Sequence, residues 1–212
     1  MNGLLFVVSA PSGAGKTSLL KALVPSDPQL SLSVSHTTRP MRPGEENGVH
    51  YHFVAMEQFQ KLAAQGGFLE QAQVFDNYYG TAEEAVQYQL STGRDLVLEI
   101  DWQGASQVRK RFPEAISIFI VPPSIEALEH RLGGRGQDNE DVIQRRMRDA
   151  VNELSHYAEY DYLVMNDSFE QALSELESIV EAERLRMNRS ASVHIQALRE
   201  MLALGGSENV RQ

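Results

Sequence analysis

The feature that most constrains the fold is the stretch SAPSGAGKT at residues 9–17. It follows a continuous apolar run, GLLFVVS at 3–9, which is typical of a strand buried on both faces of a parallel sheet. It leads into TSLLKALV, whose apolar residues have helical spacing, and we expect this helix to stop at Pro25. A glycine-rich turn between a buried strand and a helix start aims successive backbone N–H groups at one point. The stretch therefore predicts a phosphate-binding loop that holds a nucleotide.

The loop departs at one position from the usual pattern, G-x-x-x-x-G-K-[ST]. Ala10 stands where the first glycine is expected, while Gly15, Lys16 and Thr17 fit. An alanine at the exit of a strand can adopt extended backbone without strain, so we predict a working loop. Lys16 would reach the terminal phosphates, and the Thr17 hydroxyl would ligate Mg²⁺. The residues expected to bind the nucleotide here are Ala10, Pro11, Ser12, Gly13, Ala14, Gly15, Lys16, Thr17 and Ser18.

Apolar strands alternate with helical patterns along most of the chain. Further strands are expected at 30–34, 68–75, 95–100, 115–121 and 162–166. This alternation predicts an α/β fold of the P-loop NTPase class, with a doubly wound, mainly parallel sheet. Turn residues and polar aromatics interrupt it between about 35 and 90, which predicts an inserted lobe. The expected division is a core at 1–34 and 91–190, a lobe at 35–90 and a helical tail at 191–212.

Charge and composition limit the classes of partner that this chain is expected to bind. Nineteen basic against twenty-nine acidic residues leave a formal charge of −10, so a nucleic acid or an anionic membrane is not expected as a partner. The chain contains no cysteine, which excludes disulfides, thiolate catalysis and cysteine zinc sites. Without a recognisable N-terminal signal or a long apolar run, we expect a cytoplasmic protein.

The run LVLEID at 96–101 supplies acids beside the predicted loop. A hydrophobic strand that ends in a carboxylate helps to hold Mg²⁺ or its waters, and Asp101 is the stronger candidate. Glu99 projects from the same face two residues earlier, and an ordinary polar strand end explains it equally well. The segment 101–104 also fits the D-x-x-G of switch GTPases. That reading is the weaker one, because no N-K-x-D stretch follows to read a guanine.

The predicted lobe holds the groups that suit a second, phosphorylated substrate. SHTTRPMRPGE at 35–45 presents Arg39 and Arg42 around a proline, and two guanidinium groups this close suit a phosphate dianion. Tyr51 and the NYYGT run at 77–81 add hydroxyl groups that donate to phosphate oxygens and rings that can flank a base.

Six segments together resemble guanylate kinase, and closely the bacterial enzymes: SAPSGAGKT, SHTTRPMRPGE, NYYGT, LEIDWQGA, RLGGRGQD and YDYLVMND. The resemblance runs from about residue 4 to about 187. It implies transfer of the γ-phosphoryl group of ATP, with Mg²⁺, to GMP or dGMP. It implies GMP contacts from Ser35, Arg39, Arg42, Tyr51, Glu70, Tyr79, Thr81 and Asp101.

In that resemblance Glu70 accepts from guanine N1–H and the exocyclic amine, Thr81 donates to O6, and Asp101 lies close to the amine. Adenine offers an acceptor at N1 and lacks the amine, so the carboxylate would be left unpaired against it. Thr81 replaces the serine of some relatives but keeps the hydroxyl. Glu99 stands where many relatives have aspartate, which leaves its role open.

The segment RLGGRGQDNEDVIQRRMR resembles the family's mobile lid, placed at about 122–140. Arg131, Arg135 and Arg146 are candidates to close over the phosphates, and Asn166 is expected near the adenine of ATP. The acceptor is already an anion, so in-line transfer needs no general base and depends on positioning and charge neutralisation. The residues expected to act in catalysis are Lys16, Arg39, Arg135 and Arg146.

Two alternatives stay open. Scaffold proteins carry non-catalytic guanylate-kinase-like modules that bind peptides, but these generally have damaged phosphate loops, and Lys16, Thr17 and Asp101 are present here. A kinase for another nucleoside monophosphate is the nearer alternative. Glu70 and Thr81 argue against adenine as the base of its acceptor. The apolar stripe of the tail is expected to pack on its own domain, and the oligomeric state, a homo-oligomer included, is not determined by the sequence.

Overall fold

The computed structural model describes residues 2–74, 76–133 and 140–208 of the chain. It divides into two compact units, Met1–Leu173 and Ser174–Gln212. The first unit holds two sheets and all of the segments that the sequence assigns to substrates. The expected division into core, lobe, lid and tail stays a prediction.

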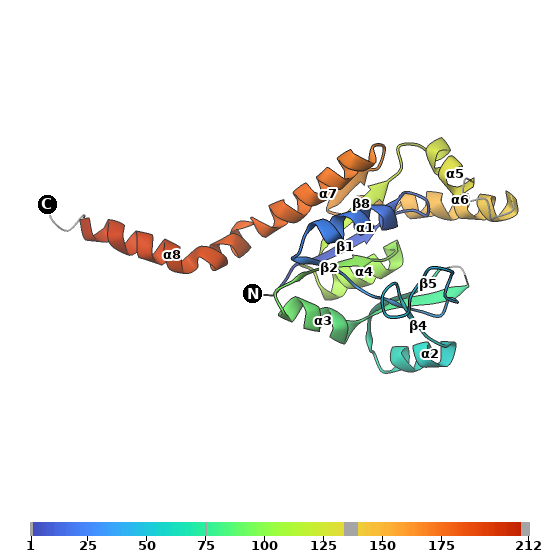
Figure 1. The fold of residues 1–212 in the computed structure, drawn as a ribbon, viewed down its shortest axis with the longest axis horizontal. Helices are drawn as coiled ribbons and strands as arrows, with labels where there is room; N and C mark the ends of the chain where they lie inside the picture. The colour runs from blue at the N-terminus through green and yellow to red at the C-terminus, as the bar shows by residue number, and fades with distance from the viewer. Residues whose placement is uncertain (1, 75, 134–139, 209–212) are drawn as a thin grey trace. The chain divides into compact units, whose positions relative to one another are not determined.

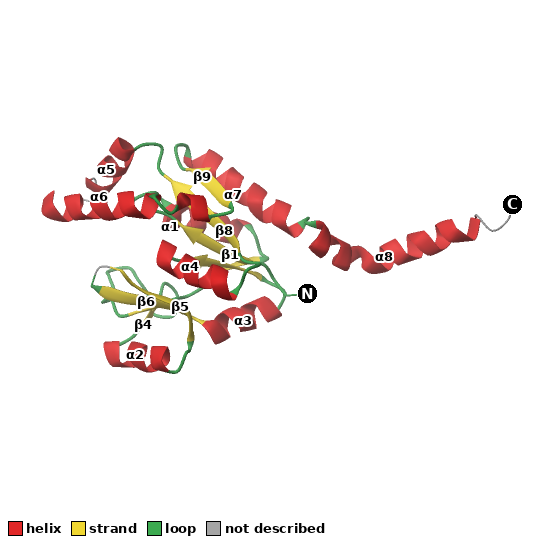
Figure 2. Ribbon diagram, turned by 180° about the vertical axis from the view of Figure 1, so that it is seen from behind, coloured by secondary structure: helices red, strands yellow, loops and turns green. Residues whose placement is uncertain are grey.

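The first sheet is parallel throughout and has the strand order β2-β7-β1-β8-β9 (Figures 1 and 2). Its strands are β1 (Leu5–Ser9), β2 (Leu30–Leu32), β7 (Asp95–Glu99), β8 (Ile116–Val121) and β9 (Tyr162–Met165). All five begin within two residues of the strands predicted from apolar runs. The predicted α/β class with a mainly parallel sheet is confirmed.

Helices cover both faces of this sheet. Along each strand, side chains alternate between the two faces, and in β1 they are buried on both. Leu5 and Val7 of β1 pack into a cluster with buried residues of α3 (Glu83–Ser91) and α4 (Trp102–Arg111). Phe6 and Val8 alternate with them and are also buried. Figures 1 and 2 show α1 (Lys16–Ser26) and α4 on opposite sides of β1.

The helix α1 ends one residue later than expected. Its last residue is Ser26, so Pro25 lies inside the helix and the prediction that the helix stops at Pro25 is wrong. Three buried leucines, Leu19, Leu20 and Leu23, anchor one face of the helix. Pro25 has no N–H to donate to the carbonyl four residues earlier, and the helix ends one residue after it.

The second sheet corresponds to the predicted lobe and has the order β4-β3-β6-β5. Its strands β5 and β6 are antiparallel, β3 pairs antiparallel with β6, and β3 pairs parallel with β4. Their bounds are β3 (His36–Thr37), β4 (His52–Phe53), β5 (Phe68–Val74) and β6 (Asn77–Ala82), with α2 (Met56–Ala64) between β4 and β5. Phe59 of α2 stacks on Phe68 of β5 at 4.5 Å between ring centroids, which joins the helix to the sheet.

After β8 the chain forms α5 (Ile125–Gly133), α6 (Glu140–Leu154) and a short 3₁₀ helix, Tyr157–Glu159. Leu128 and Leu132 of α5 form a buried cluster with Ala150 of α6. This packing places α5, which lies in the predicted lid segment, against α6, which follows it. Arg135 lies outside the described residues, and so does the side chain of Arg146 on α6.

The second unit contains the larger part of α7 (Phe169–Arg184) and α8 (Met187–Glu208). The apolar stripe of the tail, expected to pack on its own domain, lies on α8 and is exposed at Ile195, Leu198, Met201 and Leu202. Among the described residues, no helix combines the length and the apolar character that crossing a membrane requires.

Candidate active site

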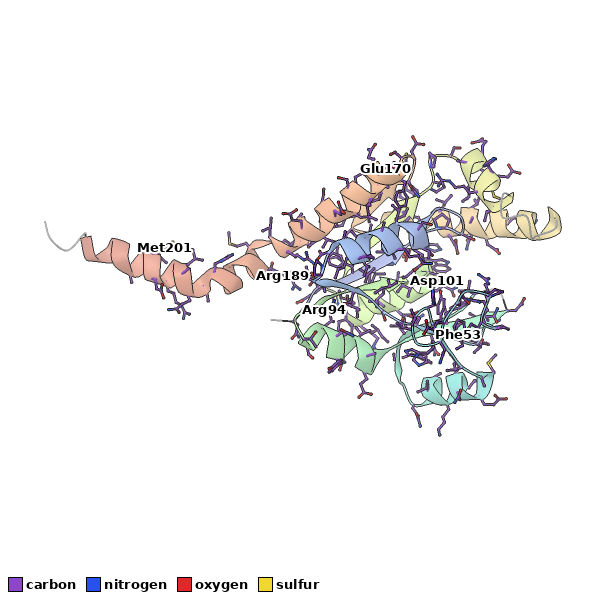
Figure 3. The ribbon with its side chains drawn as sticks, in the orientation of Figure 1. Phe53, Arg94, Asp101, Glu170, Arg189 and Met201 are labelled. Atoms are coloured by element: carbon purple, nitrogen blue, oxygen red, sulfur yellow. The ribbon has the colours of Figure 1, made fainter. Side chains whose placement is uncertain are left out.

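One pocket of the first unit is lined from two sides. On one side are the phosphate loop, through residues such as Ser12, Gly15 and Lys16, and the end of β7 at 99–101. On the other are Ser35, Tyr51, Glu70 and Tyr79 of the second sheet and its loops. Figure 3 labels Asp101, which follows β7, and Phe53, which lies in the second sheet. The segments predicted to hold two substrates therefore face a single cavity.

The loop has the curled backbone that glycine permits. Gly13 has φ 89° and Gly15 has φ 95°, both in the left-handed region where other residues are strained. A Cβ on Gly15 would lie 2.3 Å from the Asn166 side-chain nitrogen, so space as well as conformation requires glycine there. Ala10 follows the last residue of β1 and lines the pocket, outside the tightly curled part.

Two residues that the sequence assigns to the ATP site, Asn166 and Arg131, support the loop from behind. The Asn166 side-chain N–H group donates to the Ala14 carbonyl at 2.7 Å, and Asn166 is buried. The Arg131 guanidinium donates to the Asn166 carbonyl at 2.9 Å. Asn166 thus binds the backbone of the loop, and Arg131 contacts it through Asn166 and at 3.5 Å from the Ala14 carbonyl. The contacts with adenine and with phosphates that the sequence assigns to these residues stay predictions.

The side chains at the start of α1 point to the end of β7. The Lys16 ammonium donates to the Ile100 carbonyl at 3.1 Å. The Thr17 hydroxyl donates to Glu99 at 2.5 Å. Asp101, the stronger candidate from the sequence, instead caps α4 by accepting from the Gly104 N–H at 2.8 Å. The carboxylate that adjoins Thr17 is therefore Glu99, whose role the sequence left open.

A buried carboxyl group forms the floor of the opposite side. Glu70 is 3% exposed and accepts from the Thr81 hydroxyl at 2.5 Å, and that hydroxyl also lies 3.1 Å from the Ser35 hydroxyl. Burial, aided by the charge of Asp101, raises the pKa of Glu70 to about 7 against the opposing hydrogen bond from Thr81. A Cβ on Gly104 would come within 2.5 Å of a Glu70 carboxyl oxygen, so α4 has room for this carboxyl only because residue 104 is glycine.

The arginine predicted to hold the acceptor's phosphate is itself held in place. Glu45 accepts from both terminal nitrogens of Arg39, at 3.0 and 2.7 Å, and these hydrogen bonds raise the pKa of Arg39. The Arg39 guanidinium carbon also lies 5.6 Å from the ring centres of Tyr51 and Phe53. Arg42 is exposed, and its backbone N–H donates to Glu45 at 2.8 Å.

The two pocket tyrosines adjoin this group. The rings of Tyr51 and Tyr79 meet edge to face, with 5.9 Å between their centroids. Burial, with the charge of Glu99 as the second cause, raises the pKa of Tyr51 to about 12. Its hydroxyl therefore stays protonated at neutral pH and is available as a donor.

Comparison with known proteins decides the family. The family model described as Guanylate kinase matches residues 3–183. The chain belongs to the guanylate kinase family. A curated guanylate kinase of Alkalilimnicola ehrlichii is 59% identical over 202 residues, which cover 95% of this chain and all of that protein.

A solved structure agrees with this assignment, and a second one shares the fold. The crystal structure of guanylate kinase from Anaplasma phagocytophilum has a TM-score of 0.73 and 33% identity, and the match covers 89% of each chain. The SH3-kinase fragment of tight junction protein 3 has a TM-score of 0.50 at 9% identity, covering 87% of this chain and 59% of that one. This second likeness concerns the fold alone.

For a guanylate kinase family member, the structure brings together most of the residues that the resemblance implied. Of the GMP set, the pocket is lined by Ser35, Tyr51, Glu70, Tyr79 and Asp101. Thr81 adjoins the pocket, because its hydroxyl donates to Glu70. The roles of all these residues stay predictions.

Sequence reasoning assigned no role to two acidic residues of this site. Glu45 ends the segment SHTTRPMRPGE at 35–45, and its spacing from Arg39 could have suggested an ion pair. Glu153 of α6 lines the pocket and accepts from the Ser12 N–H at 2.9 Å. No motif signals Glu153, because its position depends on how α6 packs in three dimensions.

Proposed function

We propose that this pocket carries out the reaction of the guanylate kinase family: transfer of the γ-phosphoryl group of ATP to GMP, or dGMP, to give ADP and GDP. The observation that carries the proposal is the pairing of a phosphate loop with the buried Glu70 and Thr81 groups in one cavity. The names of the curated relatives support the same reaction.

On the donor side, the proposal assigns ATP to the loop. The backbone N–H groups around Gly13 and Gly15, the start of α1 and the Lys16 ammonium all present positive charge to the phosphates. This arrangement stabilises the charge that develops on the transferred group. The loop does so largely with backbone groups, which Ala10 supplies as well as glycine does.

The site also fits Mg²⁺, the ion proposed to accompany ATP. Thr17 and Glu99 offer hard oxygen ligands beside the loop, and Asp101 adds a carboxylate in the same pocket. Mg²⁺ typically takes one or two protein ligands together with phosphate oxygens and water, which matches so small a set. When bound, the ion would neutralise charge on the phosphates.

On the acceptor side, the proposal assigns the GMP phosphate to Arg39, Arg42, Tyr51 and Tyr79, and the base to Glu70 and Thr81. The ion pair between Arg39 and Glu45 orients the guanidinium before the substrate arrives. An ionised Glu70 pairs with two donors of guanine and would face an acceptor on adenine. Arg135 and Arg146 are proposed to add charge neutralisation.

The test is ADP release from ATP and Mg²⁺ with GMP, dGMP, AMP, UMP or no acceptor. We expect release that depends on GMP or dGMP and falls by orders of magnitude with AMP. Release that no nucleotide stimulates would overturn the proposal and favour the non-catalytic module. Equal release with GMP and AMP would mean that Glu70 does not recognise the base.

A further inference from the structure

The Glu153 carboxylate occupies part of the phosphate loop. It lies in the last turn of α6 and accepts from the Ser12 backbone N–H at 2.9 Å. Both residues line the same pocket as Lys16 and Thr17. Backbone N–H groups of such a loop are the donors that hold phosphate oxygens. A carboxylate oxygen therefore stands where an oxygen of the nucleotide would be expected.

The surroundings of Glu153 make this an unfavourable place for a carboxylate. Burial, reinforced by the charges of Asp101 and Asp149, raises the pKa of Glu153, while the Ser12 N–H and Lys16 act in the opposite direction. Satisfying one backbone donor does not require a charge, since a neutral amide oxygen accepts equally well. The negative charge itself thus calls for an explanation other than the stability of the loop.

The Glu153 carboxylate and a phosphate oxygen cannot both accept from the Ser12 N–H at the same time. The Ser12 N–H has one hydrogen to donate, and two anionic oxygens on the same donor would repel each other at close range. The attraction to Lys16 is shared in the same way, because that ammonium is the cation expected at the phosphates. Whatever free energy Glu153 gains in the empty loop is lost when phosphate binds.

We propose that Glu153 is a competitor for the phosphate loop, which holds the Ser12 N–H in the empty enzyme and is displaced by the phosphates of ATP. Glu153 thereby weakens nucleotide binding and speeds the departure of ADP. The inference rests on the proposed function only in that the loop holds the phosphates of ATP. Glu153 is not assigned a part in the chemical step.

The matched change is Glu153→Gln, which keeps the size and the acceptor oxygen and removes the charge. We expect the dissociation constants of ADP and of pyrophosphate, measured calorimetrically with Mg²⁺, to fall by roughly three- to tenfold. The GMP dissociation constant should not change. Glu84→Gln removes the same charge from an exposed position on α3 and should leave all three constants unchanged.

Pyrophosphate isolates the loop, because it has no base or ribose that could contact Glu153 in another way. Glu153→Ala, with thermal unfolding as the check on folding, provides a second variant and should also tighten pyrophosphate binding. Unchanged or weaker binding by both variants, with GMP-dependent ADP release intact, would overturn the competitor role alone. A wild-type chain that binds neither ADP nor pyrophosphate would overturn the proposed donor site, and this inference with it.

Discussion

The two sides of the pocket recognise their proposed ligands by different means. The loop side uses backbone N–H groups between Ala10 and Thr17, positioned by two left-handed glycines. The base side uses the side chains of Ser35, Glu70 and Thr81, linked by hydrogen bonds of 2.5 and 3.1 Å. Backbone donors are present whatever the side chain, whereas a hydroxyl or a carboxyl is lost by one substitution. The loop side should therefore tolerate changes that the base side does not.

Besides the two left-handed glycines, Lys16 is an exception on the loop side, and its loss should have the largest effect. Lys16→Ala removes the one side-chain cation of the loop, so we expect kcat to fall by about 10²- to 10³-fold. GMP binding should change much less, since the ammonium contacts the donor side. Steady-state kinetics together with GMP calorimetry check both statements, and near-normal turnover would remove Lys16 from catalysis.

Glu70→Gln tests the base side. The amide offers one acceptor oxygen and places donors against guanine, so kcat/KM for GMP should fall by about 10- to 100-fold. The value for AMP should fall less, which erodes the preference between the two. Competition assays with both nucleotides measure the ratio. Glu84→Gln serves as the control for loss of charge, and an unchanged ratio would show that another residue reads the base.

Lowering the pH should weaken GMP binding through the same carboxyl. The pKa of Glu70 is raised to about 7, so the group is ionised above that pH and protonated below it. Only the ionised form accepts from both guanine donors, and between pH 8 and pH 6 the GMP dissociation constant should rise about tenfold. The phosphate of GMP titrates near pH 6, so the Glu70→Gln variant provides the baseline. A wild-type profile that matches this baseline would contradict the assignment.

Ala10→Gly should have the smallest effect. The substitution restores the usual first glycine at a position where the backbone needs no special conformation, and we expect kcat and KM for ATP to stay within about twofold of wild type. A large gain in activity would mean that the alanine methyl group hinders the nucleotide. The expectation that the loop side tolerates substitutions would then be wrong at this position.

The sequence alone determined the elements whose signals are local. Continuous apolar runs predict the strands of the parallel sheet, because strands buried on both faces carry apolar residues at every position. The phosphate loop was equally predictable, since the glycines, Lys16 and Thr17 lie within nine consecutive residues. The assignment of Glu70 and Thr81 to one base site came from the family resemblance, and the hydrogen bond between the two side chains is a finding of the structure.

Only the tertiary structure decided which polar groups meet across the pocket. Glu99 rather than Asp101 adjoins Thr17, because Asp101 is engaged as the cap of α4. Asn166 reaches Ala14 and Glu153 reaches Ser12 across more than 140 positions of the chain. Contacts of this kind depend on how whole helices and strands pack, and no periodicity or spacing in the sequence encodes them.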